Sequence, residues 1–156
     1  MRRAWRLIRR KRLSDAFTGE GARLGGGRWN HRGTPVVYVS ETLSLAALEL
    51  FVHFTGRDIN LAKSLVAIPV DIPDSLEISE IHVKDLDPVW RTSPPPDYTK
   101  DIGTQWAQCK ASPILRVPSA VIPEEYNLML NPAHEGFRKI KTGKPRDFTL
   151  DERMWK

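Results

Sequence analysis

The chain has 156 residues, 40% of them apolar, with five Trp and five Phe, which is enough for one domain with a substantial core. A formal net charge of +5 favours anionic partners, and a single cysteine, Cys109, excludes an intrachain disulfide framework. No apolar run approaches the roughly 20 residues needed to span a bilayer, and the N-terminus lacks the apolar core of a signal peptide, so we expect a cytoplasmic protein.

The N-terminal part of the chain predicts two strands separated by a loop. Residues 4–8 alternate between two faces, which is typical of a short strand. Residues 14–32 are polar and rich in glycine, which predicts a long loop of the kind that carries function. Residues 35–40 are apolar and β-branched, which predicts a buried strand.

A helix is predicted after the second strand. Either Ser40 or Thr42 can cap its N-terminus, and Gly56 is expected to end it. Apolar residues recur at helical spacing and predict a buried stripe. The residues of this stripe are Leu45, Leu48 and Val52.

The second half of the chain predicts more strands than helices. A helix is expected from Thr99, after a proline-rich connection, with Cys109 on its buried face as a small core residue rather than a nucleophile. A short helix is expected at 134–141. Predicted strands are 63–71, 76–83, 114–118 and 127–131, with a short strand at 148–150 closing the sheet. Because strands and helices do not alternate regularly, the pattern favours an α+β fold with mixed sheets over a doubly wound one.

One constellation in the first 50 residues points to a ligand site. Residues 25–30 read Gly-Gly-Gly-Arg-Trp-Asn, and Tyr38 and Glu49 follow. Glycines allow a backbone to approach a ligand closely, and the planar guanidinium of Arg28 matches phosphate oxygens. A carboxylate within an apolar helix is costly unless it has a partner or a task. Together these residues predict a site for a phosphate-bearing ligand with a reacting sugar or base.

Other motifs lead to less specific interpretations. Residues 19–24 begin like a dinucleotide fingerprint, but Leu24 stands where the third glycine belongs, and no phosphate-binding P-loop is present. The four histidines show no paired ligand spacing, so no metal site is expected. The basic run at 2–12 lacks the aromatics of a nucleic-acid surface, and a solvated arm is the simpler interpretation.

Seven segments, in the same order and over nearly the whole chain, resemble the RES-domain toxins of bacterial RES–Xre toxin–antitoxin pairs. Each segment is unspecific alone, and the resemblance rests on their order. The segments are Gly19-Glu20-Gly21-Ala22, Gly26-Gly27-Arg28-Trp29-Asn30, Val37-Tyr38, Leu45-Ala46-Ala47-Leu48-Glu49, Ile102-Gly103-Thr104-Gln105-Trp106, Val117-Pro118-Ser119-Ala120-Val121 and Asn127-Leu128-Met129-Leu130-Asn131-Pro132-Ala133-His134.

This resemblance implies an ADP-ribosyltransferase-like fold of mainly antiparallel sheets with flanking helices. It implies a single domain over residues 1–156, with a core at about 14–142 and the basic N-terminal strand and the C-terminal tail as flanks. It also implies an enzyme that consumes NAD+ as substrate without another cofactor. The implied catalytic residues are Arg28, Tyr38, Glu49 and Ser119, and the implied substrate-binding residues are Arg6, Trp29, Asn30 and Asn131.

The implied chemistry suits these side chains. Glu49 would stabilise the positive charge that builds on the ribose as nicotinamide leaves, and Arg28 would clamp the pyrophosphate. Tyr38 would border the nicotinamide, and Ser119 would hydrogen-bond the ligand rather than act as a nucleophile. The acceptor of the ADP-ribose is open: water, phosphate or a specific host protein.

The resemblance also implies partners. A cognate Xre-like antitoxin is expected to bind the toxin, so that contact with DNA is only indirect, through the antitoxin, and no membrane is involved. The alternative from another functional class is a non-catalytic basic module that binds nucleic acid or an acidic protein. That alternative needs only the net charge and leaves the constellation of Arg28, Tyr38 and Glu49 unexplained.

Overall fold

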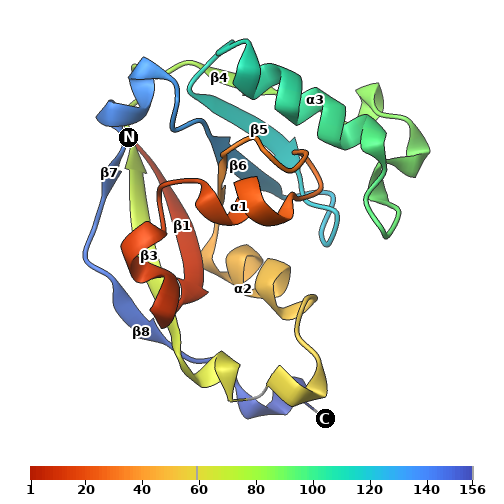
Figure 1. Ribbon diagram of the computed structural model, residues 1–156. Coiled ribbons are helices and arrows are strands. Elements are labelled where there is room, and N and C mark those ends of the chain that lie inside the picture. The colour runs from red at the N-terminus through yellow and green to blue at the C-terminus, as the bar shows by residue number, and fades with distance from the viewer. Residues whose placement is uncertain (59, 156) are drawn as a thin grey trace.

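The computed structural model describes residues 1–58 and 60–155. Its strands build one sheet in the order β4-β5-β6-β2-β1-β3-β7, with β8 also paired to β3 (Figure 1). Every pairing is antiparallel except that of β4 with β5. The strands are β1 (Arg2–Arg9), β2 (Val37–Ser40), β3 (Leu65–Ile72), β4 (Ile78–Glu80), β5 (Ile114–Pro118), β6 (Tyr126–Leu130), β7 (Lys141–Thr142) and β8 (Arg146–Phe148). This mixed, mainly antiparallel sheet with separate helices confirms the predicted α+β class.

The helices are short and flank the sheet. The α-helices are α1 (Glu20–Gly25), α2 (Leu43–Phe51) and α3 (Asp97–Gln108). The 3₁₀ helices are η1 (Arg10–Asp15), η2 (Gly56–Asp58), η3 (Leu61–Lys63), η4 (Val83–Asp85), η5 (Pro88–Arg91), η6 (Glu135–Lys139) and η7 (Glu152–Trp155). Within the described part of the chain, none of these helices has both the length and the apolarity to cross a membrane.

The sheet splits between β1 and β2, and the cavity described below lies at this split. Strand β1 pairs with β3 along its whole length, from Arg2 opposite Ile72 to Arg9 opposite Leu65. Its register with β2, in contrast, is the single pair Trp5 and Ser40. Figure 1 accordingly shows β1 and β3 on one side, β5 and β6 on the other, and α1 and α2 flanking the space between them.

Apolar side chains pack on both faces of the sheet. On one face, the core includes Val37, Val39, Leu128 and Leu130, which alternate with residues of the opposite face as strand geometry requires. On the other face, α3 packs Trp106 against Trp29, Trp90 and strand residues, while α2 packs Ala46 and Ala47 against β1 and β3. The helices α2 and α3 thus cover the face from which Tyr38 projects.

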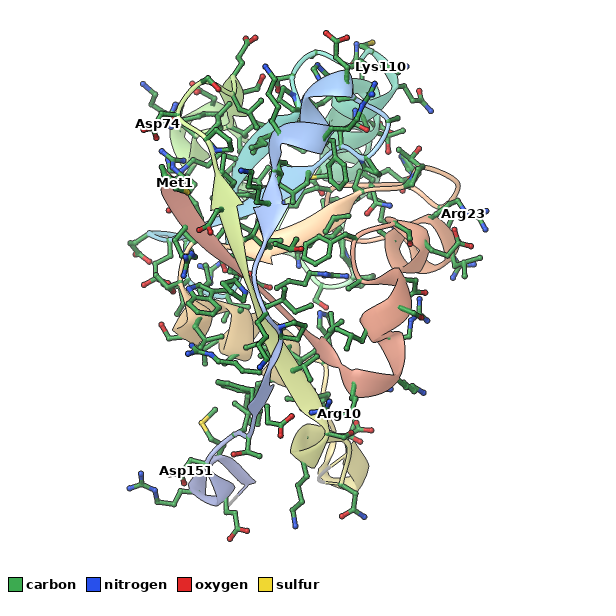
Figure 2. The ribbon with its side chains drawn as sticks, turned by 90° about the vertical axis from the view of Figure 1, so that its left-hand side faces the viewer. Met1, Arg10, Arg23, Asp74, Lys110 and Asp151 are labelled. Atoms are coloured by element: carbon green, nitrogen blue, oxygen red, sulfur yellow. The ribbon has the colours of Figure 1, made fainter. Side chains whose placement is uncertain are left out.

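The chain ends are part of this architecture. Strand β1, expected as a basic flank, lies between β2 and β3 in the interior of the sheet. The N-terminal ammonium donates to Asp74 at 2.6 Å (Figure 2). Arg10 forms an ion pair with Asp147 of β8. The C-terminal strand was expected at 148–150 and is found slightly earlier, as β8.

Several predicted elements need correction. The segment 14–32, expected as a loop, contains the end of η1 and all of α1, whose glycines and lack of buried residues concealed it. The strand expected at 76–83 is reduced to β4, and the helix expected at 134–141 is the 3₁₀ helix η6, which His134 caps. The helix expected from Thr99 begins two residues earlier, at Asp97.

The predicted buried stripe of α2 is confirmed at Leu45 but not at Leu48 or Val52. Its buried residues are Leu45, Ala46 and Ala47, whereas Val52 follows the helix and is 54% exposed. Thr42 caps the helix, since its Oγ1 accepts a hydrogen bond from the Leu45 amide at 3.1 Å. The helix ends at Phe51 rather than near Gly56. Cys109, predicted as a core residue, is exposed because it caps the C-terminus of α3.

Candidate active site

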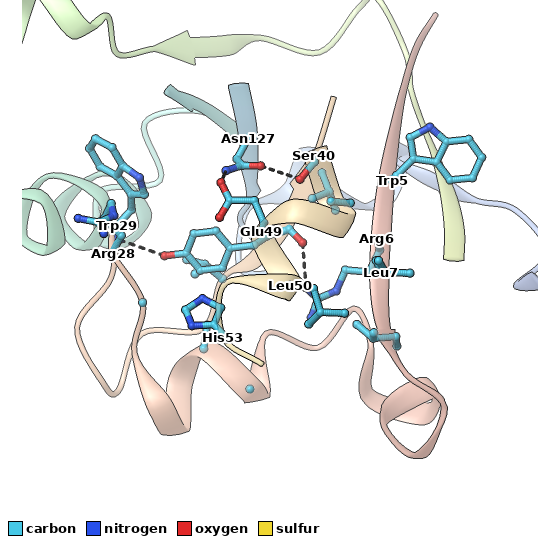
Figure 3. A pocket seen from close by; sticks show the side chains of 18 of the residues that line it. Trp5, Arg6, Leu7, Arg28, Trp29, Ser40, Glu49, Leu50, His53 and Asn127 are labelled. Carbon is cyan, nitrogen blue, oxygen red and sulfur yellow. Dashed lines mark hydrogen bonds between the residues drawn. The ribbon is translucent and has the colours of Figure 1, made fainter. Parts of the chain in front are cut away.

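A cavity of about 500 Å³ opens where the sheet splits. Its walls come from β1, η1, the 26–29 loop, β2, α2 and the segment after β5 (Figure 3). Four arginines and two carboxylates contribute to its lining, which gives the cavity an excess of positive charge. These charged residues are Arg6, Arg9, Arg12, Asp15, Arg28 and Glu49.

Glu49 enters the cavity from α2 and is held at one oxygen. Its Oε1 accepts a hydrogen bond from the Ser119 hydroxyl and another from the Asn127 amide, both at 2.6 Å. Among the described residues, no hydrogen bond is recorded to the other oxygen, Oε2. Figure 3 shows Glu49 beside Asn127 in the cavity. The carboxylate is therefore fixed in place, with one oxygen available to a ligand.

Ser119 supports Glu49 from behind the cavity wall. The side chain is fully buried and is not among the lining residues. Its hydroxyl accepts from the amides of Val121 at 3.0 Å and Ile122 at 3.1 Å, so its own proton is directed to Glu49. The Ser119 hydroxyl thus contacts Glu49 and does not line the cavity, whereas we expected it to hydrogen-bond the ligand directly.

The Tyr38 side chain lines the cavity, but its hydroxyl forms hydrogen bonds within the protein interior. It donates to Oδ1 of Asn30 at 2.7 Å and accepts from the Trp29 amide at 3.2 Å. Burial raises the pKa of the Tyr38 phenol well above its usual range. A Cβ on Gly27 would lie 2.8 Å from the Tyr38 hydroxyl, so the glycine permits this close approach.

Asn30 organises the glycine-rich loop and does not reach the cavity. It is fully buried, and its amide donates to the carbonyls of Ala22, His31 and Thr34 at 2.9, 3.1 and 3.3 Å. Asn30, expected to line the ligand site, therefore does not line this cavity. Together with Tyr38 it fixes the loop from which Arg28 and Trp29 project.

Arg28 lies at the cavity wall, and one of its nitrogens is hydrogen-bonded to the backbone. Its Nη1 donates to the carbonyls of Trp90 and Thr92, both at 2.8 Å, while its other nitrogens have no hydrogen bond recorded within the described residues. Burial lowers the pKa of Arg28, and the negative charge of Glu49 partly opposes this effect. The guanidinium is thus oriented by the backbone and retains donors for an anionic ligand.

Helix α3 anchors the loop that carries Arg28. The Thr99 hydroxyl donates to the Arg28 carbonyl at 2.7 Å, and the His31 amide donates to Thr104 Oγ1 at 2.9 Å. Between these contacts, a Cβ on Gly103 would overlap the Trp29 carbonyl oxygen. The indole of Trp29 is buried and packs 6.2 Å from that of Trp90.

Arg6 forms part of the cavity wall at the split itself. Its Nε donates to the Ala16 carbonyl at 3.1 Å, and its Nη1 donates to the Tyr38 carbonyl at 2.8 Å. Burial lowers its pKa to about 10, although the nearby Asp15 carboxylate acts in the opposite direction. Arg6 therefore links β1, η1 and β2 and also presents positive charge to the cavity.

Asn131 lies elsewhere. It is buried behind β6, where its amide donates to the Ala107 carbonyl and its oxygen accepts from the Ala133 amide, both at 3.0 Å. Asn131, expected to line the ligand site, does not line this cavity and instead caps the turn after β6. The sequence showed a polar residue in a strand but not which way it points.

Sequence reasoning missed several residues of the site. Asn127 and Ser40 form a hydrogen-bonded pair next to Glu49, and His53 and Arg9 line the cavity. Pairing of Ser40 with Asn127 depends on strand register, which no local pattern reveals. His53 stands four residues after Glu49, a spacing that could have placed it on the same side of the helix.

Comparisons with known proteins show the family of this chain and agree with its fold. A protein-family model described as "RES domain" matches residues 3–151. The chain is 37% identical over 151 residues to "Toxin Res" of Yersinia enterocolitica, covering 96% of this chain and 97% of the relative. It is 38% identical over 154 residues to "Prs ADP-ribosylating toxin" of a Sphingobium species, covering 96% and 94% respectively.

A solved structure shares the fold. The crystal structure of the M. tuberculosis MbcT-MbcA toxin-antitoxin complex contains a chain that superimposes with a TM-score of 0.76, at 18% identity. The match covers 95% of this chain and 84% of that one. It supports the α+β architecture independently of the sequence relatives.

Proposed function

Since this chain belongs to the RES-domain family, we propose that it is the toxin of a toxin–antitoxin system and that it consumes NAD+ by cleaving the nicotinamide–ribose bond. One observation carries the proposal: Glu49 presents a single available oxygen to a cavity that is otherwise rich in arginine. A fixed carboxylate among cations is what a dinucleotide with a reacting ribose requires.

The reaction needs little more than charge stabilisation. As the glycosidic bond breaks, positive charge develops at the ribose carbon, and nicotinamide leaves as a neutral base. A fixed carboxylate such as Glu49 stabilises the developing charge without having to reorganise. Its rigid hold by Ser119 and Asn127 supports this role, because preorganised groups contribute more than mobile ones.

The pyrophosphate would be bound by the cationic wall. Arg28 retains guanidinium donors after its contacts with Trp90 and Thr92 and can form charge-assisted hydrogen bonds to phosphate oxygens. Arg6, on β1 at the other side of the cavity in Figure 3, adds positive charge to it, although two of its nitrogens are used within the protein. Tyr38 offers its ring, and not its hydroxyl, as a border for the nicotinamide.

Two outcomes of this cleavage differ in the acceptor. The first is transfer of ADP-ribose to water or phosphate, which degrades NAD+. The second is transfer to a specific host protein, and it is favoured by one comparison: a relative with 38% identity is named an ADP-ribosylating toxin. Both use the same Glu49 chemistry.

The proposed partner is a cognate Xre-like antitoxin, through which any contact with DNA would be indirect. The solved structure that shares this fold is a toxin–antitoxin complex. The arginines around the cavity would also attract a carboxylate-bearing segment of such a partner. We therefore propose that the antitoxin covers the cavity near Arg28 and Glu49.

The decisive experiment is mass spectrometry of the products that the purified protein forms from NAD+, with Glu49→Gln as the test variant. The substitution keeps shape and removes charge, and loss of one such contact typically costs about 10²–10³ in rate. Glu77→Gln, at an exposed carboxylate outside the cavity, is the matched control. A folded Glu49→Gln protein with normal NAD+ turnover would refute the proposal.

The same products separate the remaining possibilities. Free ADP-ribose indicates water as acceptor, its phosphorylated form indicates phosphate, and a protein with added mass indicates transfer. The non-catalytic binding module predicts no loss of NAD+ together with nucleic-acid binding that falls steeply with salt.

A further inference from the structure

We propose that Asn127, oriented by Ser40, is a positioning residue that leaves Glu49 only one reactive oxygen, Oε2. The inference rests on the proposed function for its catalytic consequence, but its geometric basis is independent of any substrate. Neither residue belongs to the set that the sequence analysis selected.

The two residues meet because of strand register. Ser40 on β2 and Asn127 on β6 are direct partners in the antiparallel ladder, so their side chains project from the same face of the sheet. Both residues contribute to the cavity wall, with Ser40 nearly fully buried and Asn127 beside Glu49. Figure 3 shows the three side chains in sequence: Ser40, Asn127 and Glu49.

The hydrogen bonds define the orientation of the Asn127 amide. The Ser40 hydroxyl lies 2.6 Å from Asn127 Oδ1 and donates to it, which turns the amide nitrogen toward Glu49. With the amide reversed, its oxygen would lie 2.6 Å from the carboxylate, and two acceptors would face each other. The carboxylate, which can only accept, therefore selects the orientation in which Asn127 donates, and the Ser40 hydroxyl holds that orientation by donating to Asn127 Oδ1.

Glu49 Oε1 then receives two donors, one from Asn127 and one from Ser119. Two donors, one from strand β6 and one from the residue that follows β5, fix the plane of the carboxylate as well as its position. The terminal torsion of a glutamate is otherwise broad, so one donor alone would allow rotation. With Oε1 engaged, Oε2 is the oxygen that faces the ribose.

This arrangement predicts that loss of Asn127 lowers kcat strongly and changes KM little. Asn127→Ala should reduce the kcat for NAD+ consumption by about tenfold or more, because a charge-assisted hydrogen bond to the reacting carboxylate is lost. The KM should change by less than about threefold, since Asn127 is not proposed to hold the phosphates. Ser40→Ala should lower kcat in the same direction but less, as it removes only the orienting contact.

A double-mutant cycle tests whether Ser40 acts through Asn127. If it does, the variant with both substitutions should be no slower than Asn127→Ala alone. Additive losses of kcat would show that Ser40 does not act through Asn127. An unchanged kcat in Asn127→Ala would refute the positioning role of Asn127. Melting temperatures measured on all variants identify any loss of rate that arises from unfolding.

A spectroscopic readout keeps this inference separate from the proposed function. In an NMR spectrum of side-chain amides, the Asn127 resonances are those missing in Asn127→Ala. They should shift in Ser40→Ala and in Glu49→Gln, because both changes alter a hydrogen bond of that amide. Unchanged resonances in Ser40→Ala would refute the orientation by Ser40. If the wild-type protein consumes no NAD+ but the Asn127 resonances still shift in Ser40→Ala and Glu49→Gln, the proposed function is refuted and the geometry is supported.

Discussion

The guanidinium of Arg6 reaches across the split in the sheet and donates to the carbonyl of Tyr38 at 2.8 Å. It takes the place of a ladder hydrogen bond at the point where β1 and β2 separate. A second bond, from Nε to the Ala16 carbonyl at 3.1 Å, ties η1 to the same strand. The Arg6 side chain therefore keeps the two walls of the cavity apart and connects them through its hydrogen bonds.

We predict that Arg6→Met destabilises the fold by about 2–3 kcal/mol, because two carbonyls in a poorly hydrated region lose their donors. Equilibrium urea unfolding measures the change. Arg3→Gln is the matched control on the same strand, since Arg3 makes an exposed ion pair with Asp71 and should cost less than about 1 kcal/mol. Equal losses for the two variants would show that Arg6 is not a structural link.

Tyr38→Phe should destabilise the glycine-rich loop and the fold by about 1–3 kcal/mol at pH 7. The change leaves Asn30 Oδ1 without its donor and the Trp29 amide without its acceptor. Turnover of NAD+ should also fall, because this loop carries Arg28. A stable, fully active Tyr38→Phe protein would contradict the role of the hydroxyl.

The free energy of unfolding should depend differently on pH in the wild type and in Tyr38→Phe. Burial raises the pKa of Tyr38 in the folded state, so above about pH 10 the unfolded chain releases this proton while the folded protein retains it. The wild type therefore loses stability as the pH rises past about 10, whereas the Tyr38→Phe variant has no phenol at this position to titrate. The stability difference between wild type and Tyr38→Phe should narrow from about pH 9 to about pH 11, as measured by urea unfolding.

Gly103→Ala should severely impair folding. A methyl group there would overlap the backbone carbonyl of Trp29, which cannot move without displacing the loop that carries Arg28. Gly25→Ala, in α1, is the control, because a Cβ there meets no atom within 4 Å. Thermal unfolding should separate the two variants clearly, and a Gly103→Ala protein as stable as Gly25→Ala would show that α3 and the loop are not in close contact.

Much of the sheet could be predicted from the sequence, because buried strands such as β3 and β5 are short runs of apolar, β-branched residues. Helix α1 could not, since six residues with two glycines and no buried side chain lack any periodic signal. The buried stripe of α2 was misjudged because small residues, Ala46 and Ala47, form it. Hydrophobicity favoured the larger side chains nearby.

The site was partly predictable for similar reasons. Glu49 and Arg28 attract attention because a charge within an apolar helix and a charge beside glycines are locally unusual. The supporting roles of Ser119, Ser40 and Asn127 depend on which strands are neighbours and in which register. Such information is tertiary, so a sequence shows the reacting group more readily than the groups that orient it.

Arg28→Lys should raise the KM for NAD+ by about tenfold or more. An ammonium that satisfies the carbonyls of Trp90 and Thr92 has a single donor left, whereas the guanidinium retains a planar pair for a phosphate. Steady-state kinetics provides the measurement. Arg23→Lys is the control, because Arg23 is exposed and pairs with Glu20 outside the cavity. Identical kinetics for the Arg28→Lys variant and the wild type would assign Arg28 a purely structural role.

If the antitoxin covers the cavity, Arg28→Ala should weaken the toxin–antitoxin complex by at least about tenfold, because a partner carboxylate would lose its charged donor. Arg138→Ala, at an exposed arginine on η6, is the matched control for the loss of one positive charge. Isothermal titration calorimetry measures both affinities, and NAD+ turnover with antitoxin titrated in measures inhibition. Full turnover at saturating antitoxin would rule out occlusion. Inhibition combined with unchanged binding of Arg28→Ala would place the contact elsewhere on the toxin.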